Sequence, residues 1–191
     1  MSPRGVAIPE VREQLFQAAH RVLLREGPRG LTGRAITREA GVATGLLHGH
    51  FTDLDDFLVA FVSDHGRQAG ERLAALPARA GQGTVVGNLT GAALALGPDL
   101  PALAGLVTSR PALAARLREG VAFGAPVFAR FEDQFATYLE AERRLGRVAP
   151  GTDTEGLALA LFGAVHHVLL GGRTDAVGRV VAAIAAGLGA A

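Results

Sequence analysis

The sequence predicts an all-α protein in which three short N-terminal helices precede a larger helical body. Most segments repeat their apolar residues every three or four positions, which is the spacing of one face of a helix. Strand signals are weak, because alternating Val, Ile, Thr and aromatic runs joined by Asn-Gly or Asp-Gly turns do not occur. Glycine and proline divide the 191 residues into about nine helices.

Composition favours a folded chain with a substantial core. Hydrophobic residues make up 49% of the sequence and the net charge is only +1, which is not the composition of a disordered protein. The absence of cysteine excludes a disulfide framework and a thiolate metal site, and it fits a reducing cytoplasm. Residues 1–14 lack the apolar core of a signal peptide. We therefore expect a cytoplasmic protein.

The most apolar run, Gly156–Gly172, is shorter than a bilayer span needs and contains two histidines. We expect it to form a buried helix instead of a membrane span.

The net charge does not by itself predict a nucleic-acid partner, but the local balance of charge changes along the chain. Residues 1–50 hold seven arginines and four acids, an excess of three positive charges. Residues 51–64 hold four aspartates and no basic residue.

The first three helices are predicted from their apolar stripes and caps. Residues 9–26 carry one apolar stripe, and Gly27-Pro28 ends that helix. Thr32 is suited to cap the second helix, and Gly41 ends it because glycine readily adopts the left-handed conformation of a tight turn. The third helix spans residues 44–50, and Leu47 and Phe51 are expected to lie in the core, where they hold it against the first two helices. Two successive helices joined by a tight glycine turn and packed on a third form the helix-turn-helix pattern.

The remaining helices form the body of the protein. Thr52 or Asp53 is suited to cap a helix that extends to Leu76. A further helix is expected at residues 83–96, and prolines then break the chain into short pieces. The last three helices are expected at residues 121–145, 153–170 and 174–188.

An ordered set of motifs covers residues 12–58. Its pieces read "LFQAAHRVLLREGPRGLT", "RAITREAGVATGLLHGHF" and "DLDDFL". The matching positions are Ala18, Ala19, Gly27, Leu31, Thr32, Ile36, Ala40, Gly41, Val42, Gly45, Leu47, His50 and Phe51. No single position is specific, but their order resembles that of the TetR-type one-component transcriptional regulators.

The resemblance implies an all-α homodimer that represses transcription until a small-molecule effector binds. It divides the chain into a DNA-binding helix-turn-helix domain, residues 1–52, and a ligand-binding and dimerisation domain, residues 53–191. The dimer would place two copies of the third helix in successive major grooves of a near-palindromic double-stranded operator. In this family the last two long helices build the dimer interface, which corresponds here to residues 153–170 and 174–188. An intramolecular core built from these two apolar helices is the alternative.

Two positions depart from the family's pattern. The family usually has Tyr where this chain has His48, and Lys where it has Leu54, and both usual residues contact phosphates. In addition, residues 44–50 contain neither Arg nor Lys. We therefore expect family-like docking on DNA with weaker electrostatic anchoring.

With the resemblance in view, DNA-binding residues are expected on the second and third helices. Thr32 and Arg34 lie at the start of the second helix, where free N–H groups and a guanidinium suit phosphate. Thr44 can donate to a base or phosphate, Leu46 can contact a thymine methyl, and His48 can donate to phosphate. The full set is Thr32, Arg34, Ala43, Thr44, Gly45, Leu46, His48, Gly49 and His50. The alternative for these positions is an ordinary solvent-exposed surface.

Aromatic and apolar residues of the body are candidates for an effector cavity. The set is Phe61, His65, Phe123, Val127, Phe131, Phe162 and His166, and the alternative for each is ordinary core. His166 and His167 diverge by about 100° on a helix, so one is expected to face inward and the other the dimer seam. A metal site would need histidines to converge, so we predict no metal and no cofactor.

Two other classes of function stand against a regulator. A helical ligand- or protein-binding module that has lost tight DNA binding is suggested by His48, by Leu54 and by the aspartates at 53, 55 and 56. An enzyme is disfavoured, because the sequence has no nucleophile elbow, P-loop, dinucleotide fingerprint or metal-ligand cluster. Specific retention of DNA distinguishes the regulator from the binding module.

Overall fold

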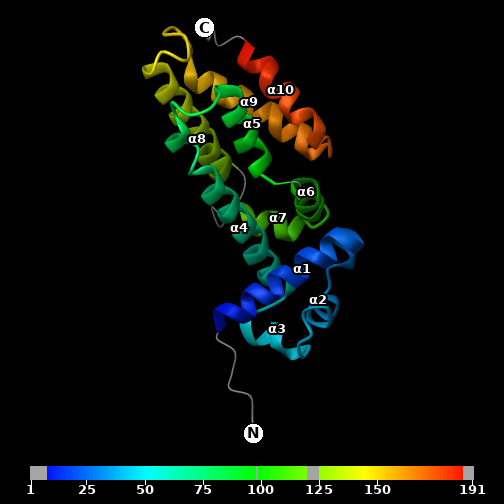
Figure 1. Ribbon diagram of the computed structural model, residues 1–191. Coiled ribbons are helices and arrows are strands. Elements are labelled where there is room, and N and C mark those ends of the chain that lie inside the picture. Colours follow the sequence, from blue (N-terminus) through cyan, green and yellow to red (C-terminus); the bar gives the residue numbers. More distant parts are fainter. Residues whose placement is uncertain (1–7, 98, 120–124, 187–191) are drawn as a thin grey trace. The chain divides into compact units, whose positions relative to one another are not determined.

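A computed structural model describes residues 8–97, 99–119 and 125–186 (Figure 1). These residues form helices, turns and loops, without a strand among them. The α-helices are α1 (Ile8–Gly30), α2 (Gly33–Ala40), α3 (Gly45–His50), α4 (Leu54–Leu73), α5 (Val85–Ala95), α6 (Leu100–Thr108), α7 (Pro111–Glu119), α8 (Ala125–Arg144), α9 (Thr154–Leu170) and α10 (Val177–Ala185). Two short 3-10 helices, η1 (Pro77–Arg79) and η2 (Thr174–Ala176), precede α5 and α10.

The described chain packs into two compact units. The first unit contains residues 8–64 and 102–119, and the second contains residues 65–97, 99–101 and 125–186. The predicted helix-turn-helix segment lies in the first unit, together with the start of α4, most of α6 and all of α7. The predicted boundary at residue 52 separates a DNA-binding domain from a ligand-binding and dimerisation domain. It is a division by function, and it stays a prediction.

The first unit is centred on α1 and a cluster of four phenylalanines. The apolar stripe predicted for α1 is buried, and each of its members is at most 7% exposed: Val11, Leu15, Ala18, Ala19, Val22 and Leu23. The ring centroid of Phe16 lies 5.5 Å from that of Phe57 and 6.0 Å from that of Phe61. Phe51 stands edge-on to Phe57 at 5.0 Å. These ring contacts join α1, the end of α3 and α4.

The predicted end of the first helix is a kink within α1. Gly27 has a φ of 70°, outside the helical region, and Pro28 follows it. A side chain at Gly27 would strain this backbone conformation, and proline cannot donate a helical hydrogen bond. One further turn then leads to Gly30.

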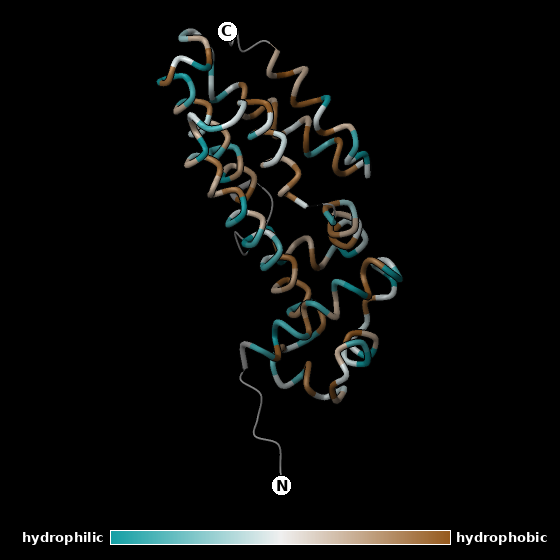
Figure 2. Tube along the Cα trace, viewed as in Figure 1, coloured by the Kyte–Doolittle hydropathy of each residue, from teal (hydrophilic) through white to brown (hydrophobic). Residues whose placement is uncertain are grey.

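The second unit is built from α5, α8, α9, α10 and the later part of α4. Its core contains the fully buried side chains Phe135, Tyr138 and Leu139 of α8. Hydrophobic residues recur along each of these helices in Figure 2. The spacing that predicted the helices therefore also supplies the core between them.

A buried polar network crosses this apolar core. The Tyr138 hydroxyl donates a hydrogen bond of 2.6 Å to the carboxylate of Glu142, whose side chain has no exposed surface. The Asn88 amide of α5 donates to the Tyr138 oxygen at 3.0 Å, and the Gly81 N–H donates to Glu142 at 3.2 Å. Arg147 lies 3.3 Å from the second oxygen of Glu142. The network thereby joins α8, the segment before α5 and the loop after α8.

Burial and the neighbouring carboxylate both act on the phenol of Tyr138. Removal of the side chain from water and its hydrogen bond to Glu142 raise the pKa of Tyr138 to about 12. The neutral phenol is therefore the stable form across the physiological range, and it remains available as a donor to Glu142.

Several helix boundaries differ from the expectation. The proline-rich middle forms two helices, α6 and α7, so the described residues contain ten α-helices instead of about nine. The helix expected to reach Leu76 ends at Leu73, and the last helix begins with the 3-10 turn η2 at Thr174. Residues 121–124 and 187–188, which were expected to be helical, lie outside the described residues.

The apolar run Gly156–Gly172 forms most of α9, as predicted. One side of α9 is buried, with Leu161, Val165 and Leu169 at most 1% exposed. Among the described residues, no single helix has both the length and the apolarity of a membrane span. The helices α5 and α6 reach that length and apolarity only when they are taken together as one bent segment.

Candidate DNA-binding surface

A tight glycine turn connects α2 to α3. The Thr32 hydroxyl caps α2 by accepting a backbone N–H of the first turn at 3.1 Å. Gly41 has a left-handed φ of 69°. Two backbone hydrogen bonds close the turn, from Gly41 to the carbonyl of Arg38 and from Val42 to the carbonyl of Thr37. The helix-turn-helix geometry predicted from these residues is confirmed.

Polar contacts fix α2 against α1. The Gln14 amide donates to the Ala40 carbonyl at 2.8 Å. Arg21 and Arg25 donate to the two oxygens of Glu39 at 2.7 and 2.9 Å. Hydrogen bonds first from Arg21 and then from Arg25 hold the pKa of Glu39 below its usual value. The two arginines thus serve the packing of the two helices.

The short helix α3 divides into a buried and an open side. Leu47 is 1% exposed and Phe51, which follows the helix, is 5% exposed, so both lie in the core as predicted. The exposed residues are Ala43, Thr44, Gly45, His48 and Gly49, while Leu46 and His50 are half-buried. The hydroxyl of Thr44 makes no capping bond to α3 and so keeps its hydrogen-bonding capacity. The open side is small and polar, and it carries no permanent charge.

Gly45 and Gly49 leave open space on this side. A Cβ atom added at either position would meet no atom of the protein within 4 Å. The glycines are therefore not required by packing within the described protein. They keep the backbone of α3 open to the approach of another molecule, although each lowers helix stability relative to alanine.

Cationic and capping groups lie beside α3 instead of on it. Thr32 and Arg34 are exposed at the start of α2, as expected for phosphate contacts. The guanidinium carbon of Arg12 on α1 lies 5.0 Å from the ring centroid of Phe51 and 5.5 Å from that of Phe16. This stacking holds a permanent positive charge next to the end of α3.

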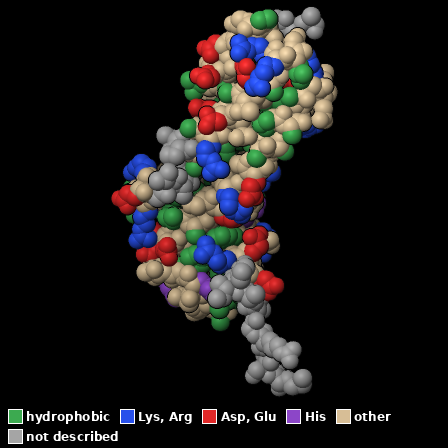
Figure 3. Space-filling model, turned by 90° about the vertical axis from the view of Figure 1, so that its left-hand side faces the viewer, with side chains coloured by type: hydrophobic (Ala, Val, Ile, Leu, Met, Phe, Trp, Pro, Cys, Tyr) green, Lys and Arg blue, Asp and Glu red, His purple; other side chains and the backbone are tan. Residues whose placement is uncertain are grey.

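The acidic start of α4 is engaged in contacts within the protein. Asp53 caps α4 through its carboxylate, which accepts the Asp56 N–H at 2.6 Å. Arg116 of α7 donates two hydrogen bonds of 3.0 Å to Asp53. Asp55 lies 3.7 Å from Arg110. Figure 3 shows arginine and acidic side chains interspersed over the face in view. The aspartates that favoured a module without DNA binding are thus partly neutralised.

Arg110 and Arg116 are residues that sequence reasoning missed. Arg116 lies 63 positions from Asp53, and Arg110 lies 79 positions from Leu31, whose carbonyl it binds at 2.8 Å. Helical periodicity relates residues three or four apart and gives no signal over such separations. Only the packing of the first unit brings these groups together.

Four of the effector-cavity candidates come together in the second unit. Val127 packs on its core, and Phe131 and Phe162 are 8% and 4% exposed. The His166 ring lies 5.0 Å from the centroid of Phe128 and 5.7 Å from that of Phe162. Burial lowers the pKa of His166. His166 thus faces inward while His167 is exposed, and the expected place of His167 at a dimer seam stays a prediction.

The other three candidates are Phe61, His65 and Phe123. Phe61 belongs to the phenylalanine cluster of the first unit, where its side chain is fully buried. His65 is half-buried on α4, and Phe123 lies outside the described residues. Within the described part of the chain, no three His, Cys, Asp or Glu residues are grouped in a way that could hold a metal ion.

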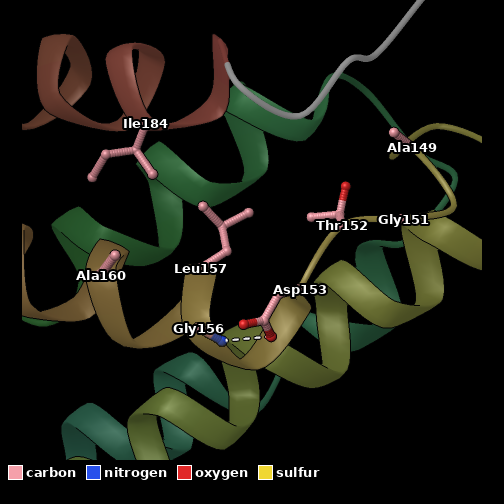
Figure 4. A pocket seen from close by; sticks show the side chains of 8 residues that line it. All are labelled: Ala149, Gly151, Thr152, Asp153, Gly156, Leu157, Ala160 and Ile184. Carbon is pink, nitrogen blue, oxygen red and sulfur yellow. Dashed lines mark hydrogen bonds between the residues drawn. The ribbon is translucent and has the colours of Figure 1, made fainter.

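A surface groove lies where α9 begins and α10 ends. Figure 4 shows Leu157 and Ala160 of α9 and Ile184 of α10 pointing into it. The Asp153 carboxylate accepts the Gly156 N–H at 3.0 Å and so caps α9. None of the effector-cavity candidates lines this groove. Its carboxylate is occupied by the helix cap, and its remaining surface is mostly apolar.

The outer side of α9 and α10 is exposed and unusually apolar. Leu159 and Leu170 of α9 are 58% and 38% exposed. Small residues accompany them, with Gly156, Ala160, Gly163, Ala182 and Ala186 exposed and Ala164 half-buried. Gly178 is half-buried and Ala185 is buried, so these two small residues serve the core side of α10. A surface of this kind suits close approach by another helix.

The comparisons with known proteins agree with this geometry. Residues 15–61 match the bacterial regulatory proteins of the tetR family. No curated protein matches the sequence. Among solved structures, a protein described as a TetR-family regulator from Mesorhizobium loti is 18% identical with a TM-score of 0.72, covering 95% of this chain and 98% of that one.

Two similar structures contain a ligand. FadR from Bacillus subtilis in complex with stearoyl-CoA is 17% identical with a TM-score of 0.64, covering 92% of this chain and 98% of that one. SmeT in complex with triclosan is 19% identical with a TM-score of 0.66, covering 93% and 91%. Residues 15–61 therefore match the tetR family of bacterial regulatory proteins, and the chain has the fold of TetR-family transcriptional regulators.

Proposed function

We propose that the chain is a ligand-responsive DNA-binding transcriptional regulator, a repressor that a small molecule releases from a near-palindromic operator. One observation carries the proposal: α2, a left-handed glycine and α3 present an open outer side within the segment that matches the tetR family. A helix with one buried and one small, open side fits the major groove. The proposal assigns the protein no catalytic role and sets its action in the cytoplasm.

The reading surface consists of the nine residues predicted from the sequence. Thr44, Leu46 and His48 contact base edges or phosphates, and Ala43, Gly45, Gly49 and His50 line the approach of the backbone. Thr32 and Arg34 hold phosphate at the start of α2. The exposure of seven of them, all but Leu46 and His50, and the open space at both glycines support these roles.

A homodimer through α9 and α10 brings two reading surfaces to one operator. The exposed leucines and small residues of these helices support such an interface, because an apolar surface gains free energy when another copy covers it. A two-fold dimer has a self-complementary interface and matches a palindromic site.

The effector is an apolar molecule or one with an apolar part. The aromatic group formed by Phe128, Phe131, Phe162 and His166 supports this class, since such side chains commonly line ligand sites. FadR from Bacillus subtilis with stearoyl-CoA and SmeT with triclosan are similar folds that hold ligands of this character. Release requires that the effector bind two states of the protein with different affinity.

Retention of genomic DNA fragments from the parent organism tests the proposal. The purified wild-type protein is expected to retain specific fragments at low salt, where phosphate contacts are strongest. Leu159→Glu should yield a monomer in sedimentation analysis and lose the fragments, because a charge enters the centre of the interface. Leu145→Glu is the matched control, since Leu145 is 57% exposed compared with 58% for Leu159.

Each outcome decides between named alternatives. A folded wild-type protein that retains no fragment at low salt is not a DNA-binding regulator, and the helical ligand- or protein-binding module then takes its place. A Leu159→Glu protein that remains a dimer contradicts the interface through α9 and α10. Equal effects of both leucine variants would show a general cost of the added charge and contradict it as well.

A further inference from the structure

The start of α4 sets three carboxylates next to the reading helix. Asp53 follows the last residue of α3, His50, by three positions, and Asp55 and Asp56 lie two and three positions after Asp53. Three residues span at most about 11 Å between Cα atoms. This distance is close to the Debye length of about 10 Å at 0.1 M salt, so these charges act on whatever α3 binds. Unpaired, they would repel phosphate.

Arg116 holds the first of these carboxylates from another part of the chain. Both terminal nitrogens of the Arg116 guanidinium donate to the two oxygens of Asp53, each at 3.0 Å. This bidentate arrangement is the strongest geometry for an arginine and a carboxylate. It lowers the pKa of Asp53 and raises that of Arg116. The two side chains are 45% and 46% exposed, so the pair lies at the surface of the first unit.

The remaining two carboxylates also have partners. Arg110, between α6 and α7, lies 3.7 Å from Asp55 and donates to the Leu31 carbonyl at 2.8 Å. The Asp56 carboxylate accepts the Thr52 N–H at 3.0 Å. The two arginines therefore connect the segment around α7 to the start of α4 and to the turn before α2.

We propose that Arg116, assisted by Arg110, determines the affinity for DNA without touching it, by neutralising the acidic start of α4 beside the reading helix. Arg116 is in this sense a positioning residue, acting through Asp53. The inference rests on the proposed function, because it concerns the same binding surface. It also gives a reason why aspartates can occupy this position in a DNA-binding protein.

Three variants and one control test the inference on a DNA fragment that the wild-type protein retains. Arg116→Gln leaves Asp53 unpaired and should weaken binding about fivefold at low salt. The loss should shrink as salt rises, because the exposed charge is then screened. Arg116→Gln with Asp53→Asn removes both charges and should return the affinity to the wild-type level. Asn still caps a helix well, so α4 is preserved in this double variant.

Asp53→Asn alone should bind at least as tightly as the wild-type protein, because it removes a negative charge and leaves Arg116. Arg118→Gln is the matched control, since it removes one positive charge from the exposed side of the same helix. Its effect should be smaller than that of Arg116→Gln. Circular dichroism on all variants checks that each is folded.

The alternatives give different results. If the double variant binds as weakly as Arg116→Gln, Arg116 contacts DNA directly and the inference is wrong. Equal losses in Arg116→Gln and Arg118→Gln would mean that net charge alone matters, which also overturns it. An unchanged affinity of Arg116→Gln, with normal retention by the wild-type protein, defeats the inference while the proposed function stands. Absence of retention by the wild-type protein defeats both.

Discussion

One long-range polar contact of the first unit and one of the second lie in opposite environments. In the first unit, Arg116 and Asp53 meet at the surface, and nearly half of each side chain is exposed. In the second unit, the Glu142 carboxylate has no exposed surface and accepts a hydrogen bond from the buried Tyr138, while Gly81 and the partly exposed Arg147 contact it from the outer side. Water screens the first contact and is excluded from the second.

The environment decides what each contact contributes. A surface ion pair adds little to folding, but it sets the local charge and the geometry of a binding surface. A buried carboxylate must keep its partners, because an unsatisfied buried charge costs several times the energy of one surface pair. We therefore expect variants of the second unit to change stability, and variants of the first unit to change binding.

The largest expected effect on stability comes from Glu142→Gln. The amide replaces one acceptor oxygen by a donor, so Gly81 or Tyr138 loses its partner, and the free energy of unfolding should fall by about 2–3 kcal/mol. Chemical denaturation measures this loss. Glu140→Gln is the control on the same helix, since Glu140 is 28% exposed and pairs with Arg143 and Arg144 at the surface. It should change stability by about 0.5 kcal/mol or less.

The same variant gives a spectroscopic signal. The sequence contains one tyrosine and no tryptophan, so ultraviolet absorbance reports Tyr138 alone. Loss of the Glu142 charge and acceptor should move the pKa of Tyr138 from about 12 toward 10 in the folded protein. Equal losses of stability in Glu140→Gln and Glu142→Gln would remove the contrast between the buried and the exposed contacts.

A smaller effect is expected from Gly49→Ala in the first unit. The added methyl meets no protein atom within 4 Å, so α3 should become more stable by about 0.5–1 kcal/mol. Affinity for a retained DNA fragment should nevertheless fall about tenfold, because the methyl occupies space that bound DNA needs. Gly151→Ala, where a Cβ also meets no protein atom within 4 Å, is the control for binding. Unchanged affinity of Gly49→Ala would mean that DNA does not approach this backbone.

The smallest expected effect is a pH dependence of the second unit. Burial lowers the pKa of His166 from its ordinary value of 6.5, so folding favours the neutral ring. This stabilisation is complete above pH 6.5 and is lost as the pH falls through that value toward the lowered pKa. His166→Gln should flatten the pH dependence of the unfolding midpoint between about pH 7.5 and 5.5. His167→Gln, at an exposed position, should retain the wild-type slope.

The sequence alone determined the local architecture of the protein. Apolar spacing predicted the stripe of α1, and Thr32 and Gly41 predicted the cap and turn around α2 because these residues act on neighbouring backbone groups. Leu47 and Phe51 were also assigned correctly to the core. The adjacent His166 and His167 were also separated correctly, since helical geometry fixes the angle between them.

Tertiary structure alone decided which distant residues meet. It placed Phe61 with the phenylalanines of the first unit and Phe131 with Phe162 in the second, although all three are apolar helical residues. It paired Asp53 with Arg116, so that a carboxylate whose negative charge counted against DNA binding has a cationic partner. The physical reason is range: caps and helical faces depend on residues a few positions apart, whereas these pairings depend on how the whole unit packs.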